Sequence, residues 1–496
     1  MSTGDGRDGT IRSRVARGRL SGKLAGMSLP RQILTIAFWP FLEQVLSFLN
    51  SSTSLFLSTH MNTAPGVTAQ IAAGMGAVGH VLFLGFVMQG AVGMGATAIV
   101  SRMTGARRFA DANHGACQAA VLGLMVGILS FLVMFFSTEL LVTEVFQLTP
   151  DAQSFARRYM DIASFSAIFS GVVFAVNAAL RGSGDTKLPF SMMLVADGLN
   201  IAVSLLLVYV LGMSIEGLAI GTVSGFAVAA AILVYVLHRR HKQFAAAAQG
   251  LTLDAYAATR HADYAPPVYL DRHDLIPDWN MIGRIITIGL PQAIEVFGIW
   301  LIHLYCLAVI SDLGDDVLAA HTIAVRIESL SFLPGFAIGM ASSAIVGLYL
   351  GAGSPRMALN TIRHCVLYSV CFMGGMGLIF FLFPAFFVSI FAGNAESLLA
   401  VGVPVVRVFL LCEPFFAAAI VMKMSLRGAG DTRRVMWVSY GVMGFFRVGV
   451  LWAWQRYFPE TLDLTWIWIL FSVDQMVQAW CFYRFIRDKK WIRRKV

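Results

Sequence analysis

The chain has 496 residues, of which 57% are hydrophobic and 13% are charged, and it carries a formal net charge of +9 at pH 7. This composition excludes a soluble globular protein, because apolar stretches long enough to cross about 30 Å of hydrocarbon recur along its whole length. The surplus cations lie at the chain ends and in alternate loops, which indicates membrane topology and contact with lipid and argues against nucleic acid as a partner.

A polar, arginine-rich arm opens the chain at residues 1–30, and we expect it to be disordered and to lie on the cytoplasmic face of the membrane. Six apolar runs follow and predict an N-lobe over residues 31–238. A polar insert at 239–279 is predicted to be a cytoplasmic linker. Six more runs predict a C-lobe at 280–488, before a basic cytoplasmic tail at 489–496. The predicted spans lie at about 32–58, 67–100, 115–137, 158–179, 188–211, 217–237, 282–310, 317–349, 361–391, 403–425, 435–455 and 465–486.

These runs predict helices, since only helices and closed barrels satisfy their backbone polar groups in lipid, and the runs are too long for barrel strands. The predicted fold class is therefore an all-α membrane protein with twelve transmembrane helices in two pseudo-symmetric six-helix lobes. Loops after even-numbered spans are rich in Lys and Arg, whereas those after odd-numbered spans are acidic on balance. Basic loops stay in the cytoplasm, so both termini are predicted to be cytoplasmic in a multi-pass plasma (bacterial inner) membrane protein.

One octapeptide occurs twice in the chain. Leu180–Lys187 reads LRGSGDTK and Leu426–Arg433 reads LRGAGDTR, at a separation of 426 − 180 = 246 residues. A second pair of segments, Val92–Val100 and Ile338–Val346, has the same separation. Two unrelated motifs at one spacing indicate that half of the chain is duplicated, as in many transporters. Because each copy has an even number of crossings, the lobes should be related by an axis along the membrane normal.

We interpret the octapeptide as a tight elbow between two helices at the membrane surface, although the same residues could form a binding site. Its arginine follows a long apolar run, where a cation complements the negative end of the helix dipole. Its glycines permit positive φ, and its aspartate is placed to cap the next helix. The elbow residues are Arg181, Gly182, Gly184 and Asp185 in the first copy and Arg427, Gly428, Gly430 and Asp431 in the second.

Ionisable side chains at membrane depth are costly, so each is a candidate for function. Glu43 and Glu295 follow Pro40 and Pro291 by three and four residues, and a proline bends a helix and frees backbone carbonyls, which suits a cavity wall. Glu295 is the leading candidate for binding a proton or cation, and His303 lies two turns further along. The other candidates for ion coupling or for a substrate cavity are Asp197, Asn200, Arg326, Glu328, Glu413 and Asp474.

Asp197 and Asn200 lie one turn apart and therefore on one helix face. They predict either a functional carboxylate with its hydrogen-bond partner or a polar clamp between helices. The sequence contains no histidine-rich metal motif, nucleophile elbow or phosphate loop. We therefore expect a protein that is not an enzyme and needs no metal or cofactor, and whose six cysteines are buried hydrophobes.

The doubled LRGxGDT motif, together with Val346–Gly353 (VGLYLGAG) and Leu318–Ile323 (LAAHTI), resembles the multidrug and toxic compound extrusion (MATE) family over nearly the whole chain. The resemblance implies a twelve-helix, two-lobed exporter whose central cavity opens alternately to either side of the membrane. It also implies that sodium or proton influx drives the efflux of organic, often cationic, compounds.

The family usually carries aspartates at two N-lobe positions that are Ser54 and Ser204 in this chain. Ion coupling is therefore expected to depend on Glu43, Glu295 and Glu413 instead. Replacing Glu295 with Gln is expected to abolish coupled efflux while leaving the protein folded.

These observations together predict a monomeric secondary antiporter that exports organic, cationic or amphipathic compounds in exchange for H⁺ or Na⁺ by alternating access. One alternative is a flippase for a lipid-linked precursor, from the same superfamily. Convergence of Arg326, Arg407 and Arg447 on one cavity would favour the flippase, because its substrate is anionic. A membrane-embedded enzyme or receptor is the other alternative. A pseudo-symmetric central cavity open to one side would favour a transporter over a receptor.

Overall fold

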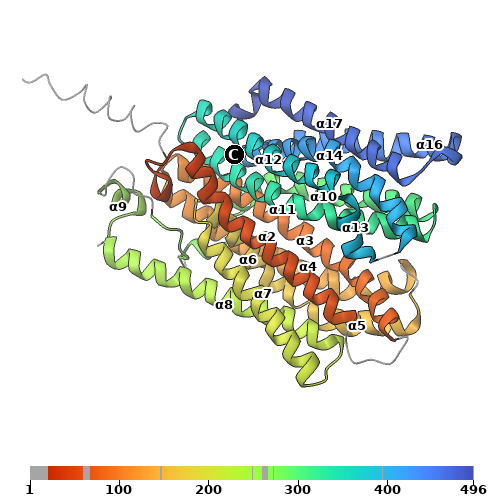
Figure 1. Ribbon diagram of the computed structural model, residues 1–496. Coiled ribbons are helices and arrows are strands. Elements are labelled where there is room, and N and C mark those ends of the chain that lie inside the picture. Colours follow the sequence, from red (N-terminus) through yellow and green to blue (C-terminus); the bar gives the residue numbers. More distant parts are fainter. Residues whose placement is uncertain are drawn as a thin grey trace, which may run out of the picture. The chain divides into compact units, whose positions relative to one another are not determined.

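The computed structural model describes residues 20–59, 67–145, 148–248, 250–259, 266–271, 273–393 and 395–494, and within these ranges it contains helices and no strands (Figure 1). The predicted all-α fold is confirmed. Residues 1–19 of the predicted arm and residues 495–496 of the predicted tail lie outside the described residues.

Ten helices in the described ranges are long and apolar enough to cross a bilayer. An eleventh crossing is formed by α5 and α6, which meet at a 54° bend. The twelfth predicted span, α17, is less apolar than the others because Asp474, Gln475 and Gln478 lie within it. These crossings fit a multi-pass membrane protein with twelve transmembrane helices. The first six crossings are α2 (Leu29–Thr59), α3 (Val67–Gly105), α4 (Phe109–Leu140), α5 (Pro150–Ala163) with α6 (Ser166–Gly182), α7 (Lys187–Leu205) and α8 (Ile215–Ala248).

The second half repeats this order with more breaks. Its crossings are α10 (Trp279–Ser311), α11 (Asp315–Gly351), α12 (Pro355–Leu382) with α13 (Pro384–Ala392), α14 (Glu396–Gly428), α15 (Thr432–Met443) with α16 (Leu451–Tyr457), and α17 (Leu464–Asp488). A π-helical stretch follows α7 (η3, Leu206–Val210), and another joins α15 to α16 (η5, Gly444–Val450). Such stretches widen a helix locally and often occur near functional sites.

The chain divides into two compact units. Most of the first unit is Leu42–Ala293, and most of the second is Ile294–Val496, whereas Met27–Phe41 at the start of α2 also belongs to the second. The units therefore change within α2 and within α10. One residue separates Pro40 from the first change, and two residues separate Pro291 from the second. These are the two prolines whose positions predicted a bend or a cavity wall.

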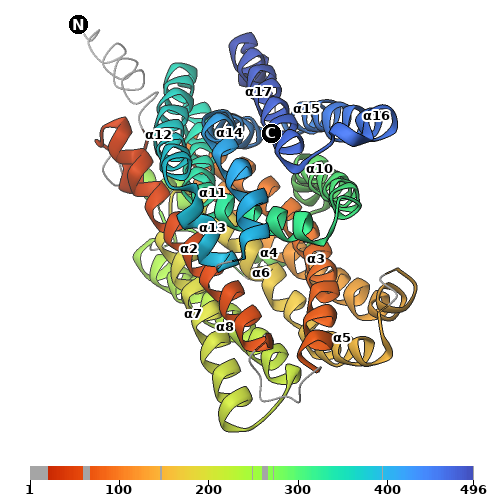
Figure 2. The same cartoon turned by 45° about the vertical axis from the view of Figure 1, so that its right-hand side comes forward.

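Helix packing inside each unit follows one pattern. In the first unit α3, α4 and α6 pack against one another and α8 packs on α6. In the second unit α11, α12 and α14 pack against one another and α17 packs on α14 (Figure 2). Small residues allow the close approach, as at Gly123 and Gly127 of α4, where an added Cβ would meet the backbone of α6. The duplication seen in the sequence is thus present in the packing.

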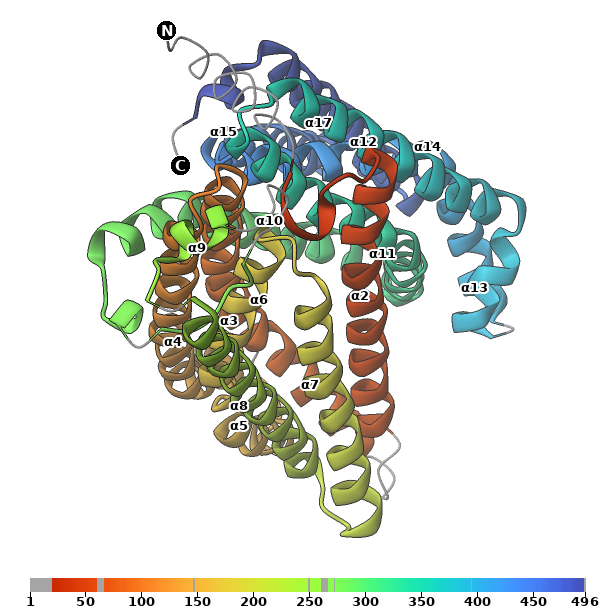
Figure 3. The same ribbon diagram turned by 90° about the vertical axis from the view of Figure 1, so that its left-hand side faces the viewer.

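The polar insert is attached to the first unit through α4. Phe244 and Leu253 of the insert region, with Tyr269, form an apolar cluster with Phe109 at the start of α4. Asp254 of the short helix α9 (Leu253–Thr259) accepts hydrogen bonds from the first two backbone N–H groups of α4, at 2.8 and 3.1 Å (Figure 3). A carboxylate at this position satisfies N–H groups that a helix cannot bond internally. The insert is therefore a docked segment of this unit.

Candidate functional site

The elbow arginine of each unit forms an ion pair with a glutamate from the first span of the same half. The Nη1 atom of Arg181 lies 3.1 Å from both carboxylate oxygens of Glu43. The Nη2 atom of Arg427 lies 2.8 Å from Oε2 of Glu295. The two arginines are equivalent in the repeat, because 427 − 181 = 246. Sequence analysis assigned these arginines to the helix dipole and missed the pairing.

The two glycines of each elbow have different roles. Gly184 and Gly430 have φ values of 89° and 85°, which confirms the predicted left-handed turn. Gly182 and Gly428 are the last residues of α6 and α14, where a neighbouring helix backbone approaches too closely for a side chain. An added Cβ on Gly182 would lie 2.9 Å from the carbonyl oxygen of Thr97, and one on Gly428 would meet the carbonyl oxygen of Ser343.

The prediction that the elbow aspartates cap the next helix is wrong, because neither carboxylate accepts a capping hydrogen bond from α7 or α15. Asp185 instead accepts from Arg240 at 2.8 Å and from Lys23 at 3.1 Å. Asp431 pairs with Arg434 and Arg494 at 3.4 and 3.2 Å. Each elbow therefore holds a neighbouring basic segment.

The pKa of Asp185 reflects these partners. Burial alone would raise the pKa of this carboxyl group. The hydrogen bond and charge of Arg240, with a contribution from Lys23, outweigh burial and hold the pKa below its ordinary value.

In the first unit Asp197 belongs to a buried hydrogen-bond network. Oδ1 of Asp197 accepts from the amide of Asn50 at 2.8 Å, and Asn200 donates to the Asn50 side chain at 3.2 Å. The hydroxyl of Ser204 donates to Asn200 at 3.2 Å. Oδ2 of Asp197 is buried and has no hydrogen-bond partner among the described residues. The network therefore joins α2 to α7 and also holds a carboxylate with one unpaired oxygen.

In the second unit Glu295 is fully buried and has three partners. Lys423 lies 3.0 Å from one carboxylate oxygen, Arg427 lies 2.8 Å from the other, and the hydroxyl of Ser439 donates at 2.6 Å. One negative charge thus faces two positive charges. A further cation would be repelled by this pair, so the site is built to hold a carboxylate in its ionised form.

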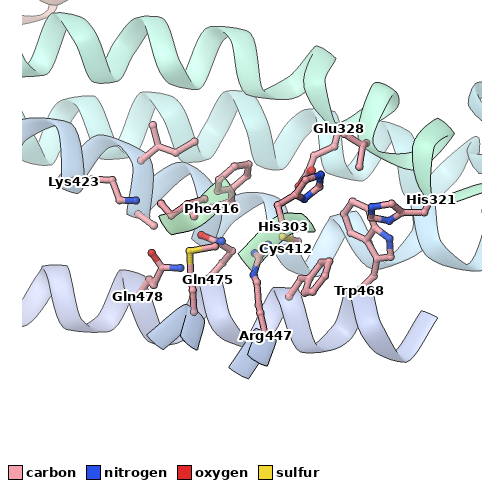
Figure 4. Close-up of a pocket in the computed structure, with 16 residues that line it drawn as sticks. His303, His321, Glu328, Cys412, Phe416, Lys423, Arg447, Trp468, Gln475 and Gln478 are labelled. Carbon is pink, nitrogen blue, oxygen red and sulfur yellow. The ribbon is translucent and has the colours of Figure 1, made fainter. Parts of the chain in front are cut away.

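A cavity of about 250 Å³ lies within the second unit, between α10, α11, α14, α17 and η5 (Figure 4). Four residues named in the sequence analysis lie at or beside it, namely His303, Glu328, Arg447 and Asp474. His303 and Glu328 line it, and the rings of His303 and His321 lie 6.3 Å apart. Arg447 also lines the cavity, and its Nε atom lies 2.5 Å from Oδ2 of Asp474 behind it. The Gln478 amide donates to the other oxygen of Asp474 at 2.5 Å.

The remaining predicted carboxylate, Glu413, lies beside Glu328 and has no cationic partner among the described residues. Glu413 is 1% exposed and accepts a hydrogen bond from Ser331, whose hydroxyl also lies 3.1 Å from the Glu328 carbonyl oxygen. Its Oε2 atom is buried without a partner in the described part of the chain. The two carboxyl groups interact electrostatically. Like Asp197 in the first unit, Glu413 thus keeps one buried oxygen without a partner among the described residues.

Two further side chains in the cavity wall lack hydrogen-bond partners within the described ranges. The Nδ1 atom of His321 and the Nε1 atom of Trp468 have no hydrogen-bond partner there. Both residues are buried, at 3% exposure each. Leaving a buried polar group without a hydrogen bond costs about 1–3 kcal/mol. Neither residue was identified from the sequence, because an apolar span with one His or Trp usually indicates core packing.

The three arginines that would favour a lipid-linked substrate do not converge. Among the described residues that line the cavity, Arg447 is present and Arg326 and Arg407 are not. Arg447 is also neutralised by Asp474, and its guanidinium lies 4.2 Å from the Phe471 ring centroid. The flippase alternative is therefore not favoured.

A family model named MatE matches this chain twice, over residues 45–206 and residues 291–452. The two matches have the same length and are separated by 291 − 45 = 246 residues, the spacing of the repeated octapeptide. The chain belongs to the MatE family. It is therefore a MATE transporter, as the resemblance of its motifs predicted, and it is not an enzyme in the usual sense.

Individual relatives agree with this assignment. The "Probable multidrug resistance protein NorM" of Thermotoga maritima is 26% identical over 429 residues, which cover 86% of each chain. The "Uncharacterized transporter YisQ" of Bacillus subtilis is 19% identical over 464 residues, covering 92% of this chain and 94% of that protein. The solved structure of a mutant of the Vibrio cholerae MATE transporter VcmN has the same fold, with a TM-score of 0.80 at 15% identity over 94% of this chain and 99% of that chain.

This MATE chain places serines where the resemblance leads one to expect two N-lobe aspartates. One of them, Ser204, lies in the hydrogen-bond network of Asp197. An N-lobe carboxylate is thus present in this network, less than two turns before Ser204 in α7. Ser54 lies in α2.

Proposed function

We propose that the protein is a secondary active exporter of organic, cationic or amphipathic compounds, driven by inward movement of H⁺ or Na⁺. Membership of the MatE family and the name of the Thermotoga relative support export of this kind. The observation that carries the coupling proposal is the buried Glu413 carboxylate, which has an unpaired oxygen and lies beside Glu328 at the cavity. A carboxyl group in this setting can bind or release a cation without breaking an ion pair.

The proposed coupling is a competition. A cation that enters down the membrane potential gains about 2.3 kcal/mol per charge per 100 mV. When it binds to Glu413, the pair of carboxylates loses one negative charge and attracts a substrate amine less strongly, and the substrate leaves. A ligand shifts a conformational equilibrium only through its different affinities for the two states, so cation and substrate must each favour a different opening of the transporter.

The paired carboxylates have another role in this proposal. Glu43 and Glu295 form ion pairs with the elbow arginines, so we assign them to the scaffold and not to ion exchange. Asp197 is the candidate for ion binding in the first unit. We also propose that the protein is a monomer in the plasma membrane, with N- and C-lobes over residues 31–238 and 280–488. The distribution of loop charges supports a cytoplasmic location for both termini and the linker.

The test is substrate efflux from proteoliposomes that contain the purified protein. A fluorescent organic cation is loaded, and either a pH gradient or a sodium gradient is imposed. The wild type should export under one of these gradients and not without it. Glu413→Gln should lose at least about 90% of gradient-driven efflux, because a neutral amide cannot exchange a cation. Glu396→Gln is the matched control, since this exposed glutamate begins the same helix.

Efflux that is independent of both gradients in the wild type would contradict secondary antiport. Full coupled efflux in Glu413→Gln would contradict the assignment of the coupling residue while leaving the export function standing.

A further inference from the structure

The last part of the polar insert, which leads into α10, is held against the first turns of α4 by side-chain amides. Asn113 accepts a hydrogen bond from the backbone N–H of Tyr269 at 2.9 Å. Gln118 donates to two carbonyl oxygens of the insert, each at 2.7 Å, and accepts from the N–H of Asp278 at 2.9 Å. Amide groups do not titrate in the physiological range, so these bonds hold the insert at any such pH.

His114, which lies between these two amides in α4, is placed between two aspartates of the insert. Its Nδ1 atom lies 2.9 Å from Oδ1 of Asp274, in the short helix η4 (His273–Leu275), and its Nε2 atom lies 3.1 Å from Oδ2 of Asp278. In the described part of the chain His114 is the only ion-pair partner of either aspartate. A carboxylate only accepts hydrogen bonds, so both ring nitrogens can bond only when both carry a proton. The geometry therefore fits the imidazolium form.

The charges that act on the His114 ring are those of Asp274 and Asp278. Other charged side chains on the neighbouring elements have hydrogen-bond or ion-pair partners elsewhere. They are Arg108 and Asp111 on α4, Arg240 on α8, Asp254 on α9 and Asp271 before η4. Cys117 and Tyr269 lie close by and are neutral at physiological pH. Without its proton, His114 would leave the two aspartates without a cation between them.

Asp278 connects this cluster to the start of α10. Its Oδ1 atom accepts from the N–H of Asn280 in the first turn of α10 at 2.9 Å, while its Oδ2 atom faces His114. The next turns of α10 pack closely on α3 of the same unit, since a Cβ added to Gly289 would meet the backbone of Ala91. The carboxylate of Asp278 therefore fixes the beginning of α10 on α4.

We propose that His114 is a proton-operated latch for the insert and for the start of α10. The imidazolium bridges Asp274 and Asp278 and holds both segments on α4. When the ring gives its proton to solvent, one nitrogen turns a lone pair toward a carboxylate and the two aspartates repel each other, so this part of the insert is released. The three side chains are 29%, 30% and 37% exposed, which lets solvent protons reach them.

The direction of the switch follows from the charge. Attachment is present while His114 is protonated, and it is lost as the pH rises through the histidine range. The insert is predicted to be cytoplasmic, so the latch responds to the pH on that side of the membrane. This inference goes beyond the proposed export function, because it depends neither on the exported compound nor on the coupling ion.

The test is amide hydrogen exchange of the purified full-length protein at about pH 6 and about pH 8.5, corrected for the intrinsic rate at each pH. The reporting amides are Tyr269 and Asp278, which donate to side chains of α4. Both should exchange about fivefold faster at the higher pH, the effect of losing two partly exposed ion pairs. The amides of Phe109 and Ala110 are the internal control, because they donate to Asp254, which is ionised at both pH values.

Variants separate the charge of His114 from its packing. His114→Arg carries a permanent charge and should keep exchange at Tyr269 and Asp278 slow at both pH values. His114→Gln has no charge and should make exchange fast at both. His273→Gln is the matched control, since this exposed histidine lies in η4 of the same insert, and this variant should keep the wild-type pH dependence.

Equal corrected rates at the two pH values in wild type would overturn the proposal, and so would a pH dependence that persists in both His114 variants or disappears in His273→Gln. Equal acceleration at Phe109 and Ala110 would also contradict it, because the whole insert would then detach. Exchange is measured without substrate or gradient. A failed latch would therefore leave the export proposal standing, and efflux without gradient dependence would leave the latch standing.

Discussion

Each of the two units contains one carboxylate that is paired with its elbow arginine and one that is not paired with a cation among the described residues. Glu43 and Glu295 are the paired groups, and Asp197 and Glu413 each keep one buried oxygen without a partner. The units differ in what surrounds the unpaired group. The first unit fills the space with amide and hydroxyl side chains, and the second has a cavity there. Both units keep an ion pair at the elbow arginine, whereas their unpaired carboxylates stand at non-equivalent places in the repeat, because 197 + 246 = 443 is Met443 and 413 − 246 = 167 is Ala167.

The ion pairs of Glu43 and Glu295 also differ in their number of partners and in their burial. Glu43 has one arginine partner, and both side chains keep some exposure, at 8% and 14%. Glu295 is at 0% exposure and faces two cations and a hydroxyl. The stability of the second unit therefore depends more heavily on its ion pair, and substituting Glu295 should destabilise the protein more than substituting Glu43.

The largest effect is expected for Glu295→Gln. Removing this charge leaves Lys423 and Arg427 buried and mutually repulsive, and breaking such a pair costs about 3–5 kcal/mol. Glu43→Gln should cost about half as much, because Arg181 can reach water more easily. The measurement is thermal unfolding of both variants in the same detergent. If Glu295→Gln were as stable as wild type, the scaffold assignment of Glu295 would be wrong.

The next effect concerns the first glycine of each elbow. Gly428→Ala would push a methyl group into the Ser343 backbone, and Gly182→Ala would place one 2.9 Å from the Thr97 carbonyl oxygen. Overpacking of this kind costs about 1–3 kcal/mol, and we expect the upper end for Gly428→Ala. Gly441→Ala is the control, since an added Cβ there meets no atom within 4 Å. Equal melting temperatures for all three variants would show that the elbows are less tightly packed than the structure indicates.

The smallest effect is a pH dependence at the first elbow. The pKa of Asp185 is lowered in the folded protein, so its pairing stabilises the fold above the ordinary aspartate range and is lost as the pH falls through the lowered value. Asp185→Asn should cost about 1 kcal/mol at neutral pH, and this cost should shrink as the pH falls through the lowered pKa of Asp185. The melting temperatures of variant and wild type should therefore converge on acidification. Parallel curves would mean that Arg240 and Lys23 do not stabilise the elbow through charge.

The helices and their duplication could be predicted from the sequence because both depend on local patterns. Apolar runs of sufficient length defined the spans, and the octapeptide spacing defined the repeat. α17 was predicted correctly from its length and position, although its polar residues weaken the hydropathy signal. The positive φ of Gly184 and Gly430 also followed from residue type.

The partners of the charged residues could not be predicted, because they lie far apart in the chain. Arg181 and Glu43 are separated by 138 residues, and Arg427 and Glu295 by 132. No periodicity connects such positions, so the arginines were assigned to the dipole and the aspartates to capping. The same limit applies to Trp468 and His321, whose missing partners become visible only when the surrounding helices are in place.

The central claim is that a cation and the substrate compete for an unpaired carboxylate in the second unit. The most direct measurement is the equilibrium affinity of the purified protein for a transported compound, over a range of pH and of sodium concentration, in wild type and in Glu413→Gln. Competition predicts that wild-type affinity rises as protons or sodium are removed, and that the variant shows no such dependence. An identical dependence in both proteins, or none in wild type, would contradict the account.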